Sequence, residues 1–300
     1  MKIRVVVQAD PRLQAHLRAL GGQRLVFFAG LPGTGKSLLV HQLAHLAGAS
    51  GRSIHLLQWD VARPPFEASP AGRRYPPADG VTHPMIRKAV GLWARHAIAR
   101  WSERHPDPRH LLIGETPFVG NRFVELAHRL DDSAEPLLGD PSCRFVIAVP
   151  SEKVRRFLES QRERRAADPL HPREREDAPP HVLRDLWRDL AAVARQMGIS
   201  GSDAGRVAGQ ESARGAAGPP PFDPVAYRQV YEAVLRHRHV EIVALDTILP
   251  TGKLSVYDFA IAPPDLAPSE AEAEQFIREV ERRYAGPVAL EREIACWWEV

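Results

Sequence analysis

The eight residues Gly30 to Ser37, GLPGTGKS, constrain the fold of this 300-residue chain more than any other stretch. They follow RLVFFAG (24–30), a continuous apolar run typical of a strand buried on both faces, and they precede SLLVHQLAHLA (37–47), whose apolar residues recur at helical spacing. Glycines let the backbone turn its N–H groups inward, and a helix N-terminus adds partial positive charge. A strand, a glycine-rich turn and a helix in this order predict an anion-binding loop.

The residue types within this loop suit the parts of a nucleoside triphosphate. Lys36 would reach the β- and γ-phosphates, and the Ser37 hydroxyl would bind Mg²⁺. Because the chain contains only five lysines, a lysine at this position is poorly explained by chance. The residues predicted to hold the nucleotide are Gly30, Pro32, Gly33, Thr34, Gly35, Lys36, Ser37 and Leu38.

Apolar runs alternate with amphipathic segments along the rest of the chain. This alternation predicts an α/β fold of three layers, in which a parallel sheet carries helices on both faces. Besides the strand before the loop, we expect core strands at 53–59, 110–115, 143–150 and 239–248. Helices are expected at 11–20, 37–47, 85–104, 121–130, 151–167, 181–197, 224–238 and 270–284, with a short strand at 2–8 and a long surface loop at 60–84.

One stretch interrupts this pattern. Residues 198–221 are Gly, Ser, Ala and Pro with almost nothing to bury, which predicts a flexible linker or disordered loop. Another core-like strand follows it, so we expect a single domain over 1–300, in which 151–221 form a lid and a flexible insertion.

Composition narrows the class of protein. The apolar runs are far too short to span a bilayer, and the N-terminus lacks a run of signal-peptide length, so we predict a cytoplasmic protein without a membrane partner. The two cysteines form neither a disulfide framework nor a zinc spacing. A net charge of +3 keeps a nucleic-acid partner open, although the basic runs lack the interleaved aromatics of single-strand binders.

The GLPGTGKS segment and the helix after it resemble the P-loop kinase branch of the P-loop NTPases, the nucleotide and small-molecule kinases. The likeness covers the architecture of 24–167 and 239–284, and only the loop is specific. It implies ATP, Mg²⁺, an acceptor site past the second strand and an arginine-bearing lid. The common GTPases are excluded because the only asparagine, Asn121, precedes Arg122, so the guanine-reading Asn-Lys-x-Asp motif is missing.

Two carboxylates stand at predicted strand ends, where open parallel sheets bind ligands. In the resembling kinases a carboxylate after the second strand accepts the proton of the attacking hydroxyl, and a nearby arginine binds an acidic part of the substrate, which assigns these roles to Asp60 and Arg63. Glu115, at the end of the third strand, is the candidate for the carboxylate that steadies Mg²⁺. The alternatives are a turn residue for Asp60 and an ordinary strand-end residue for Glu115.

The segment GETPFVGNRF partly matches the deoxynucleoside kinases. Glu115 and the Asn121-Arg122 pair have the same spacing as in that family, but Thr116 and Pro117 replace its intervening Arg and Ser. Arg122 is therefore a candidate for contact with phosphate or substrate, and equally a residue of a first helical turn.

The helix at 151–167 occupies the place of the lid in the resembling family. Arg155 and Arg162 are seven residues apart and share a face, and a lid arginine would neutralise the transferred phosphoryl group. The alternative is a solvated basic helix with weak surface ion pairs. Lys253, after the last strand, lies where that family often holds the adenine.

These features predict an ATP- and Mg²⁺-dependent kinase that moves the γ-phosphoryl group to a hydroxyl or phosphate of a small molecule or nucleotide. Two alternatives stay open: a regulatory ATPase that acts on a protein partner through a conformational change, and a kinase of nucleic-acid ends.

Overall fold

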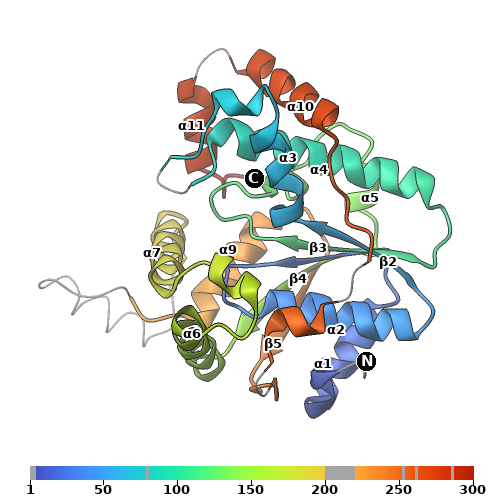
Figure 1. The fold of residues 1–300 in the computed structure, drawn as a ribbon, viewed down its shortest axis with the longest axis vertical. Coiled ribbons are helices and arrows are strands. Elements are labelled where there is room, and N and C mark those ends of the chain that lie inside the picture. Colours follow the sequence, from blue (N-terminus) through green and yellow to red (C-terminus); the bar gives the residue numbers. More distant parts are fainter. Residues whose placement is uncertain (1–4, 79–80, 200–219, 252–253, 261–262, 285–286) are drawn as a thin grey trace, which may run out of the picture.

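A computed structural model describes residues 5–78, 81–199, 220–251, 254–260, 263–284 and 287–300. Its centre is one sheet of five parallel strands in the order β2-β3-β1-β4-β5, with helices on both faces (Figure 1). The predicted three-layer α/β fold with a parallel sheet is confirmed. The strands are β1 (Leu25–Ala29), β2 (Ser53–Gln58), β3 (His110–Thr116), β4 (Cys143–Pro150) and β5 (Val240–Leu245).

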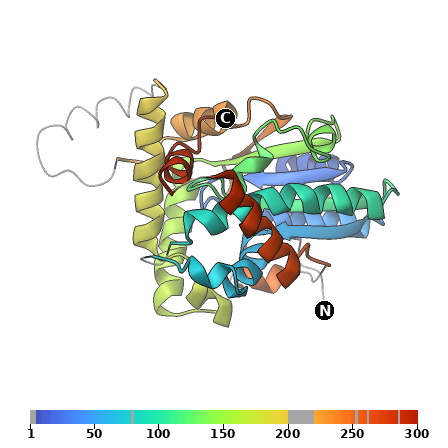
Figure 2. The ribbon, with the colours of Figure 1, turned by 90° about the horizontal axis from the view of Figure 1, so that it is seen from above.

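Alternate residues of the central strand feed two separate cores. Leu25 and Phe27 of β1 enter one apolar cluster, and Val26 and Phe28 enter the other. The second cluster is covered by α1 (Pro11–Leu20) and α2 (Lys36–Ala49). The first is covered by two groups of helices. One is the layer seen from above in Figure 2, with α3 (Trp59–Ala68), α4 (Pro84–Arg104), α10 (Glu270–Arg283) and α11 (Pro287–Ala295). The other consists of α7 (Pro180–Gln196) and α9 (Pro224–Val234), which lie between β4 and β5 in the chain.

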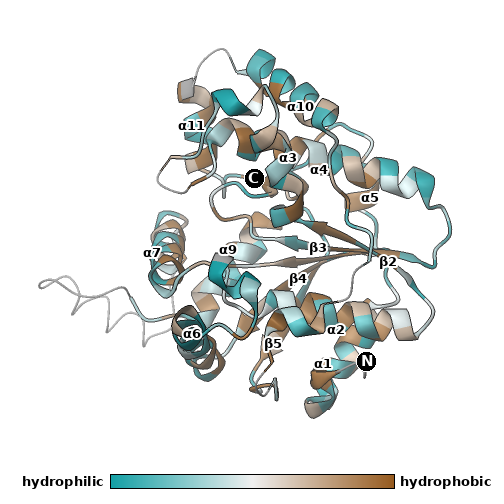
Figure 3. Cartoon of the chain, viewed as in Figure 1, coloured by the Kyte–Doolittle hydropathy of each residue, from teal (hydrophilic) through white to brown (hydrophobic). Residues whose placement is uncertain are grey.

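Hydropathy follows this layering. In Figure 3 the strands are largely apolar, whereas helices at the margin such as α6 (Glu152–Ala167) and α10 carry hydrophilic residues outward. Burial of both sheet faces explains why the strands read as continuous apolar runs in the sequence. Within the part of the chain that the structure describes, no helix is both long and apolar enough to cross a bilayer.

The strand order places a topological switch at β1. From β1 the chain crosses to β2 on one side, and from β4 it crosses to β5 on the other, so the connections diverge around the centre of the sheet. Ligands of open parallel sheets bind outside the carboxyl ends of the strands at such a point. The fold therefore puts the glycine-rich turn after β1 at the most favourable position for a ligand.

The N-terminal prediction of a strand at 2–8 is wrong over the described residues. Val6–Ala9 form a short 3-10 helix, and residues 2–4 lie outside the described part. The Val7 amide donates to the side chain of Gln42 in α2 at 3.3 Å, so this segment packs on the α2 layer instead of joining the sheet.

The predicted surface loop at 60–84 is also wrong, because α3 and a 3-10 turn at Gly72–Arg74 occupy it. Trp59, Ala62 and Phe66 recur at helical spacing and are buried against the core. Burial of this face outweighs the helix-breaking tendency of Pro64 and Pro65.

The predicted helix at 121–130 does not form; only the 3-10 turn Val124–Leu126 is present. Side chains from outside the segment take the carbonyls that a helix would pair: Arg95 donates to the carbonyls of residues 125 and 128, and Arg238 donates to those of residues 126 and 128. Left-handed φ angles at Asn121 (58°) and Phe123 (63°) prevent a regular helical start.

The region between β4 and β5 contains α6, the 3-10 turn Pro172–Glu176, α7 and α9, and the Ser151 side chain caps the start of α6. Figure 1 shows α6 and α7 beyond the carboxyl ends of the strands. The linker prediction for 198–221 falls almost entirely on residues 200–219, which lie outside the described part, as does Lys253. The sequence did not predict α5 (Glu135–Leu138), the 3-10 turn Val256–Phe259 or α11.

Candidate functional site

The loop between β1 and α2 has a backbone that requires glycine. Gly30, Gly33 and Gly35 have φ angles of 141°, 75° and 87°. A Cβ atom on Gly30 would lie 2.0 Å from the Tyr227 hydroxyl oxygen, so even a methyl group has no room there. The sequence predicted a backbone that depends on glycine in this loop, and these three glycines all have positive φ angles.

Lys36 begins α2, and its side chain is folded into the loop. The side chain is only 2% exposed, and its Nζ donates to the Leu31 carbonyl at 2.7 Å. The Thr34 hydroxyl donates to the same carbonyl at 2.8 Å, while Leu38 is half-buried in the first turn of α2. Burial lowers the pKa of Lys36, and the charge of Glu115 partly opposes that shift.

Glu115 joins the loop to the sheet. Its Oε1 lies 3.5 Å from Lys36 Nζ, and its Oε2 accepts a hydrogen bond from Ser37 Oγ at 3.1 Å. The residue stands near the end of β3, in register with Phe28 of β1 and Gln58 of β2. A hydroxyl beside a carboxylate oxygen is the donor set that Mg²⁺ prefers, so these residues fit the predicted metal.

Asp60 follows β2 at the start of α3, on the same edge of the sheet. Its side chain reaches solvent, yet the surrounding protein desolvates it; this desolvation, with the charge of Glu115 second, raises its pKa above the ordinary carboxyl range. The charges of Arg63 and Arg122 oppose the rise. Arg63, one turn further along α3, pairs with Glu67 at 2.6 Å. Three predicted site residues, Glu115, Arg63 and Arg122, thus lie within electrostatic reach of Asp60.

A second loop, residues 117–123, brings Arg122 to this edge. Burial lowers the pKa of the Arg122 guanidinium, and the nearby Asp60 charge opposes that shift. Within the described chain the Arg122 side chain makes no hydrogen bond or ion pair. The fully buried Asn121 amide is likewise unpaired there. Unpaired buried polar groups are rare in native folds and mark positions where a ligand can complete the pairing.

Sequence reasoning missed Arg87, which extends the cationic side of the site. Its Nη1 donates to the Gly120 carbonyl at 2.6 Å, and its buried Nε has no partner among the described residues. Burial and the neighbouring Arg122 charge lower its pKa to about 10. In the sequence Arg87 is one of many arginines on an amphipathic helix, so no spacing distinguished it.

The two lid arginines have different places. The Arg155 side chain is 2% exposed, and its Nη1 donates to the Gly33 carbonyl at 3.2 Å and approaches the Pro32 carbonyl at 3.4 Å. Its Nε pairs with Glu159 at 2.7 Å. Arg162 pairs with Asp177 instead. The structure therefore brings Arg155, and not Arg162, onto the glycine loop.

Comparison with models of known protein families, with curated proteins and with solved structures finds no match to this chain.

Proposed function

We propose that this chain is an ATP- and Mg²⁺-dependent kinase that transfers the γ-phosphoryl group to a small, negatively charged acceptor, a nucleotide or another small molecule. One observation carries the proposal. The glycine loop at the switch point of the parallel sheet holds the buried Lys36 and the Ser37 hydroxyl against Glu115. A second carboxylate, Asp60, has a raised pKa and lies on the same edge of the sheet.

The loop would hold the triphosphate of ATP. Its Lys36 ammonium now contacts the Leu31 carbonyl and Glu115, which it would exchange for phosphate oxygens. Arg155 touches the loop from α6 and would add charge as the phosphoryl group moves. Mg²⁺, when bound, would neutralise phosphate charge, and Ser37 and Glu115 are the residues that would hold it.

Asp60 would act as the base. An acceptor hydroxyl gives its proton to the Asp60 carboxylate, its oxygen forms a bond to the γ-phosphorus, and the bond to the β–γ bridging oxygen breaks to leave ADP. A raised pKa makes Asp60 a better proton acceptor than an ordinary aspartate. If the acceptor atom is already an ionised phosphate oxygen, Asp60 serves to orient the acceptor.

The acceptor itself would carry a phosphate or carboxylate group. Arg63 and Arg122 lie beside Asp60, Arg87 lies beside Arg122, and Arg87 and Arg122 are half-buried. Buried charges are costly without a counter-charge, and guanidinium groups suit the planar, bidentate recognition of phosphate and carboxylate. Arg63 already pairs with Glu67, but a neutral sugar or nucleoside would leave Arg122 and the Arg87 Nε without a counter-charge.

The nucleotide site is tested with Lys36→Ala. ATP should raise the melting temperature of the parent protein, and the variant should fold yet lose that rise, because the loop has lost its cation. Lys153→Ala is the matched control, since Lys153 is exposed on α6. An equal ATP-induced shift in Lys36→Ala would refute the phosphate-loop assignment.

The base is tested with Asp60→Asn, with Asp131→Asn as the control at an exposed position. Transfer should fall by about 10²- to 10⁴-fold while ATP binding persists. In the parent, the rate should fall as pH drops through the raised pKa of Asp60, because the protonated carboxyl cannot accept a proton. Retained turnover, or an unchanged pH profile in Asp60→Asn, would remove Asp60 from this role.

The acceptor is identified by transfer from γ-labelled ATP to a panel of nucleotides, sugar phosphates, hydroxy acids, neutral nucleosides and oligonucleotides. Label should appear on anionic small molecules. ADP release without a labelled acceptor would favour the regulatory ATPase, and labelled oligonucleotide ends with salt-dependent binding would favour the nucleic-acid kinase.

A further inference from the structure

Three histidines meet at the opposite edge of the sheet from the glycine loop. His55 is the third residue of β2, His105 ends α4, and His110 begins β3. One potential ligand atom from each lies within 4.8 Å of the other two, and His55 Nε2 is 2.9 Å from His110 Nδ1. Among the described residues, no other group of three or more His, Cys, Asp or Glu is arranged closely enough to hold a metal ion.

The trio stands on rigid supports. Arg24 fixes the turn between His105 and His110, because its guanidinium donates to both of their carbonyls and to that of Asp107. The same guanidinium stacks 4.3 Å from the centre of the Trp101 ring. Strand pairing holds His55 in β2, where Ser53 is in register with His110. Preorganised ligands bind metals better than ligands that must be ordered on binding.

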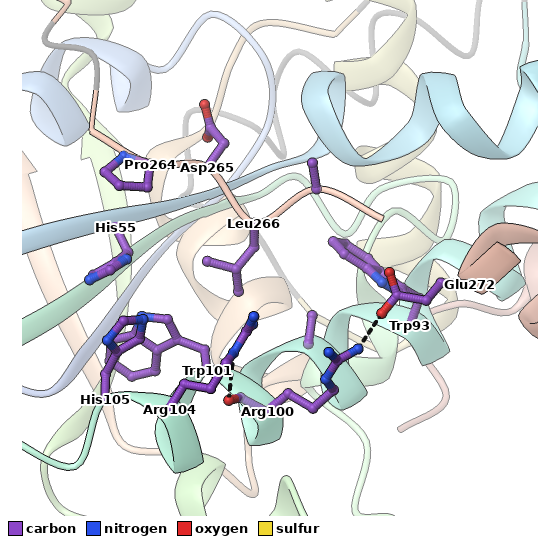
Figure 4. A pocket seen from close by; sticks show the side chains of 12 residues that line it. His55, Trp93, Arg100, Trp101, Arg104, His105, Pro264, Asp265, Leu266 and Glu272 are labelled. Carbon is purple, nitrogen blue, oxygen red and sulfur yellow. Dashed lines mark hydrogen bonds and ion pairs between the residues drawn. The ribbon is translucent and has the colours of Figure 1, made fainter. Parts of the chain in front are cut away.

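The trio is also accessible. Figure 4 shows His55 and His105 on one side of a pocket of about 330 Å³, next to Trp101, with Arg100 and Glu272 paired at the other end. His55 is mostly buried, whereas His105 and His110 are half-exposed. An ion could therefore enter from the pocket and keep a water molecule on that side.

The three imidazole rings supply nitrogen ligands of the kind that divalent transition metals take in proteins. The nearby Arg24 and Arg104 charges oppose a cation, while the Arg24 guanidinium is directed at backbone carbonyls.

We propose that His55, His105 and His110 bind one divalent transition-metal ion, with Zn²⁺ the best fit. Three imidazole nitrogen ligands with an open fourth position suit zinc. Nitrogens around a tetrahedral zinc at 2.0–2.1 Å lie about 3.4 Å apart. The His55–His110 pair, at 2.9 Å, must therefore open slightly, and the pairs that lie up to 4.8 Å apart must close by about an ångström, both within the reach of side-chain rotation. The bound ion would tie β2, the end of α4 and the start of β3 together.

This site is separate from the proposed kinase site. The strand β3 has seven residues, with His110 at its first position and Glu115 at its sixth, so these two residues lie about 17 Å apart along the strand. Zinc binding therefore does not depend on phosphoryl transfer, and either proposal can fail alone.

The test begins with protein freed of metal by a chelator and titrated with Zn²⁺ by calorimetry. One equivalent should bind, and Zn²⁺ at about 100 times its dissociation constant should raise the melting temperature by about 5 °C. His105→Ala should weaken zinc binding by about 100-fold or more, since the loss of a residue that only hydrogen-bonds to a metal ligand already lowers metal affinity by about 10- to 100-fold. Co²⁺ in place of Zn²⁺ should give the visible absorption of a tetrahedral site, which His105→Ala should abolish.

His96→Ala is the matched control, because His96 is exposed on the same helix; it should bind zinc as the parent does. His105 is preferred to the buried His55 because a half-exposed residue at a helix end tolerates truncation, and circular dichroism with a cooperative thermal melt reports that each variant is folded. Absence of stoichiometric binding in the parent, or equal zinc affinity in His105→Ala, would overturn the proposal.

Discussion

Two loops border the proposed kinase site, and both use left-handed backbone, but different forces hold them there. In the loop after β1 the left-handed residues are Gly30, Gly33 and Gly35, for which such angles carry little steric cost. In residues 117–123 they include Phe118, Asn121 and Phe123. An L-residue in this conformation costs about 1–2 kcal/mol, so the second loop is strained where the first is not.

The surroundings of the second loop hold its strained shape. The Tyr231 hydroxyl donates to the Pro117 carbonyl at 3.0 Å, Arg87 donates to the Gly120 carbonyl, and the Phe118 and Phe123 side chains are fully buried. Strain of this kind persists only where neighbours overdetermine it, and it gathers at functional sites. The first loop is therefore shaped by its own residues, and the second by its contacts.

The largest effect should follow from placing a side chain in the first loop. Gly30→Ala should lower the free energy of unfolding by about 3 kcal/mol and abolish ATP binding, because the new methyl would overlap the Tyr227 hydroxyl and strain the backbone. Gly48→Ala, in α2 with nothing near its Cβ position, should instead stabilise by about 0.5–1 kcal/mol. Chemical denaturation measures both; a Gly30→Ala protein as stable as the parent would contradict the account of the first loop.

The second loop should respond in the opposite direction. Asn121→Gly should raise the free energy of unfolding by about 1 kcal/mol, since it removes a left-handed L-residue and a buried, unpaired amide. Transfer activity should fall, because the loop that places Arg122 becomes free to move. The reciprocal change Gly120→Ala, at a φ of 66°, should cost about 1–2 kcal/mol. A stability loss in Asn121→Gly would show that this loop is not strained.

The smallest effect is expected at a residue that contacts neither loop. Arg162→Ala removes an ion pair with Asp177, and it should change stability by about 1 kcal/mol or less and transfer by less than about tenfold. Arg155→Ala is the comparison, because Arg155 touches the first loop, and its transfer rate should fall far more. Equal losses in the two variants would mean that the lid acts as a whole and not through its contact with the glycine loop.

Features shaped by their own residues, like the first loop, could be predicted from the sequence, whereas features shaped by distant contacts, like the second loop, could not. The glycines at positions 30, 33 and 35 indicate the positive φ angles that the loop adopts, and the continuous apolar runs predict a sheet buried on both faces. Lys36 and Ser37 follow from that geometry because they begin the next helix. These parts of the fold and the site depend on local chemistry, which a sequence contains.

The rest depends on distant contacts. The sequence predicts a helix at 121–130, but Arg95 and Arg238, far away in the chain, take the carbonyls that the helix would use. The positions of Arg87 beside Arg122 and of His55 beside His105 likewise arise only when strands and helices pack. No spacing in the sequence distinguishes these residues from their many neighbours of the same type.

The central position of β1 also has a consequence for biosynthesis. Its two sheet neighbours are β3 and β4, which end at Thr116 and Pro150, so the first strand to be translated must wait for partners made much later. At 5–20 residues per second the delay between β1 and β4 is on the order of ten seconds. Until then the nascent chain exposes the apolar strand that carries the glycine loop. The proposed nucleotide site would thus be completed only after about half of the polypeptide has left the ribosome, and the unpaired β1 is the segment that a chaperone would need to shield.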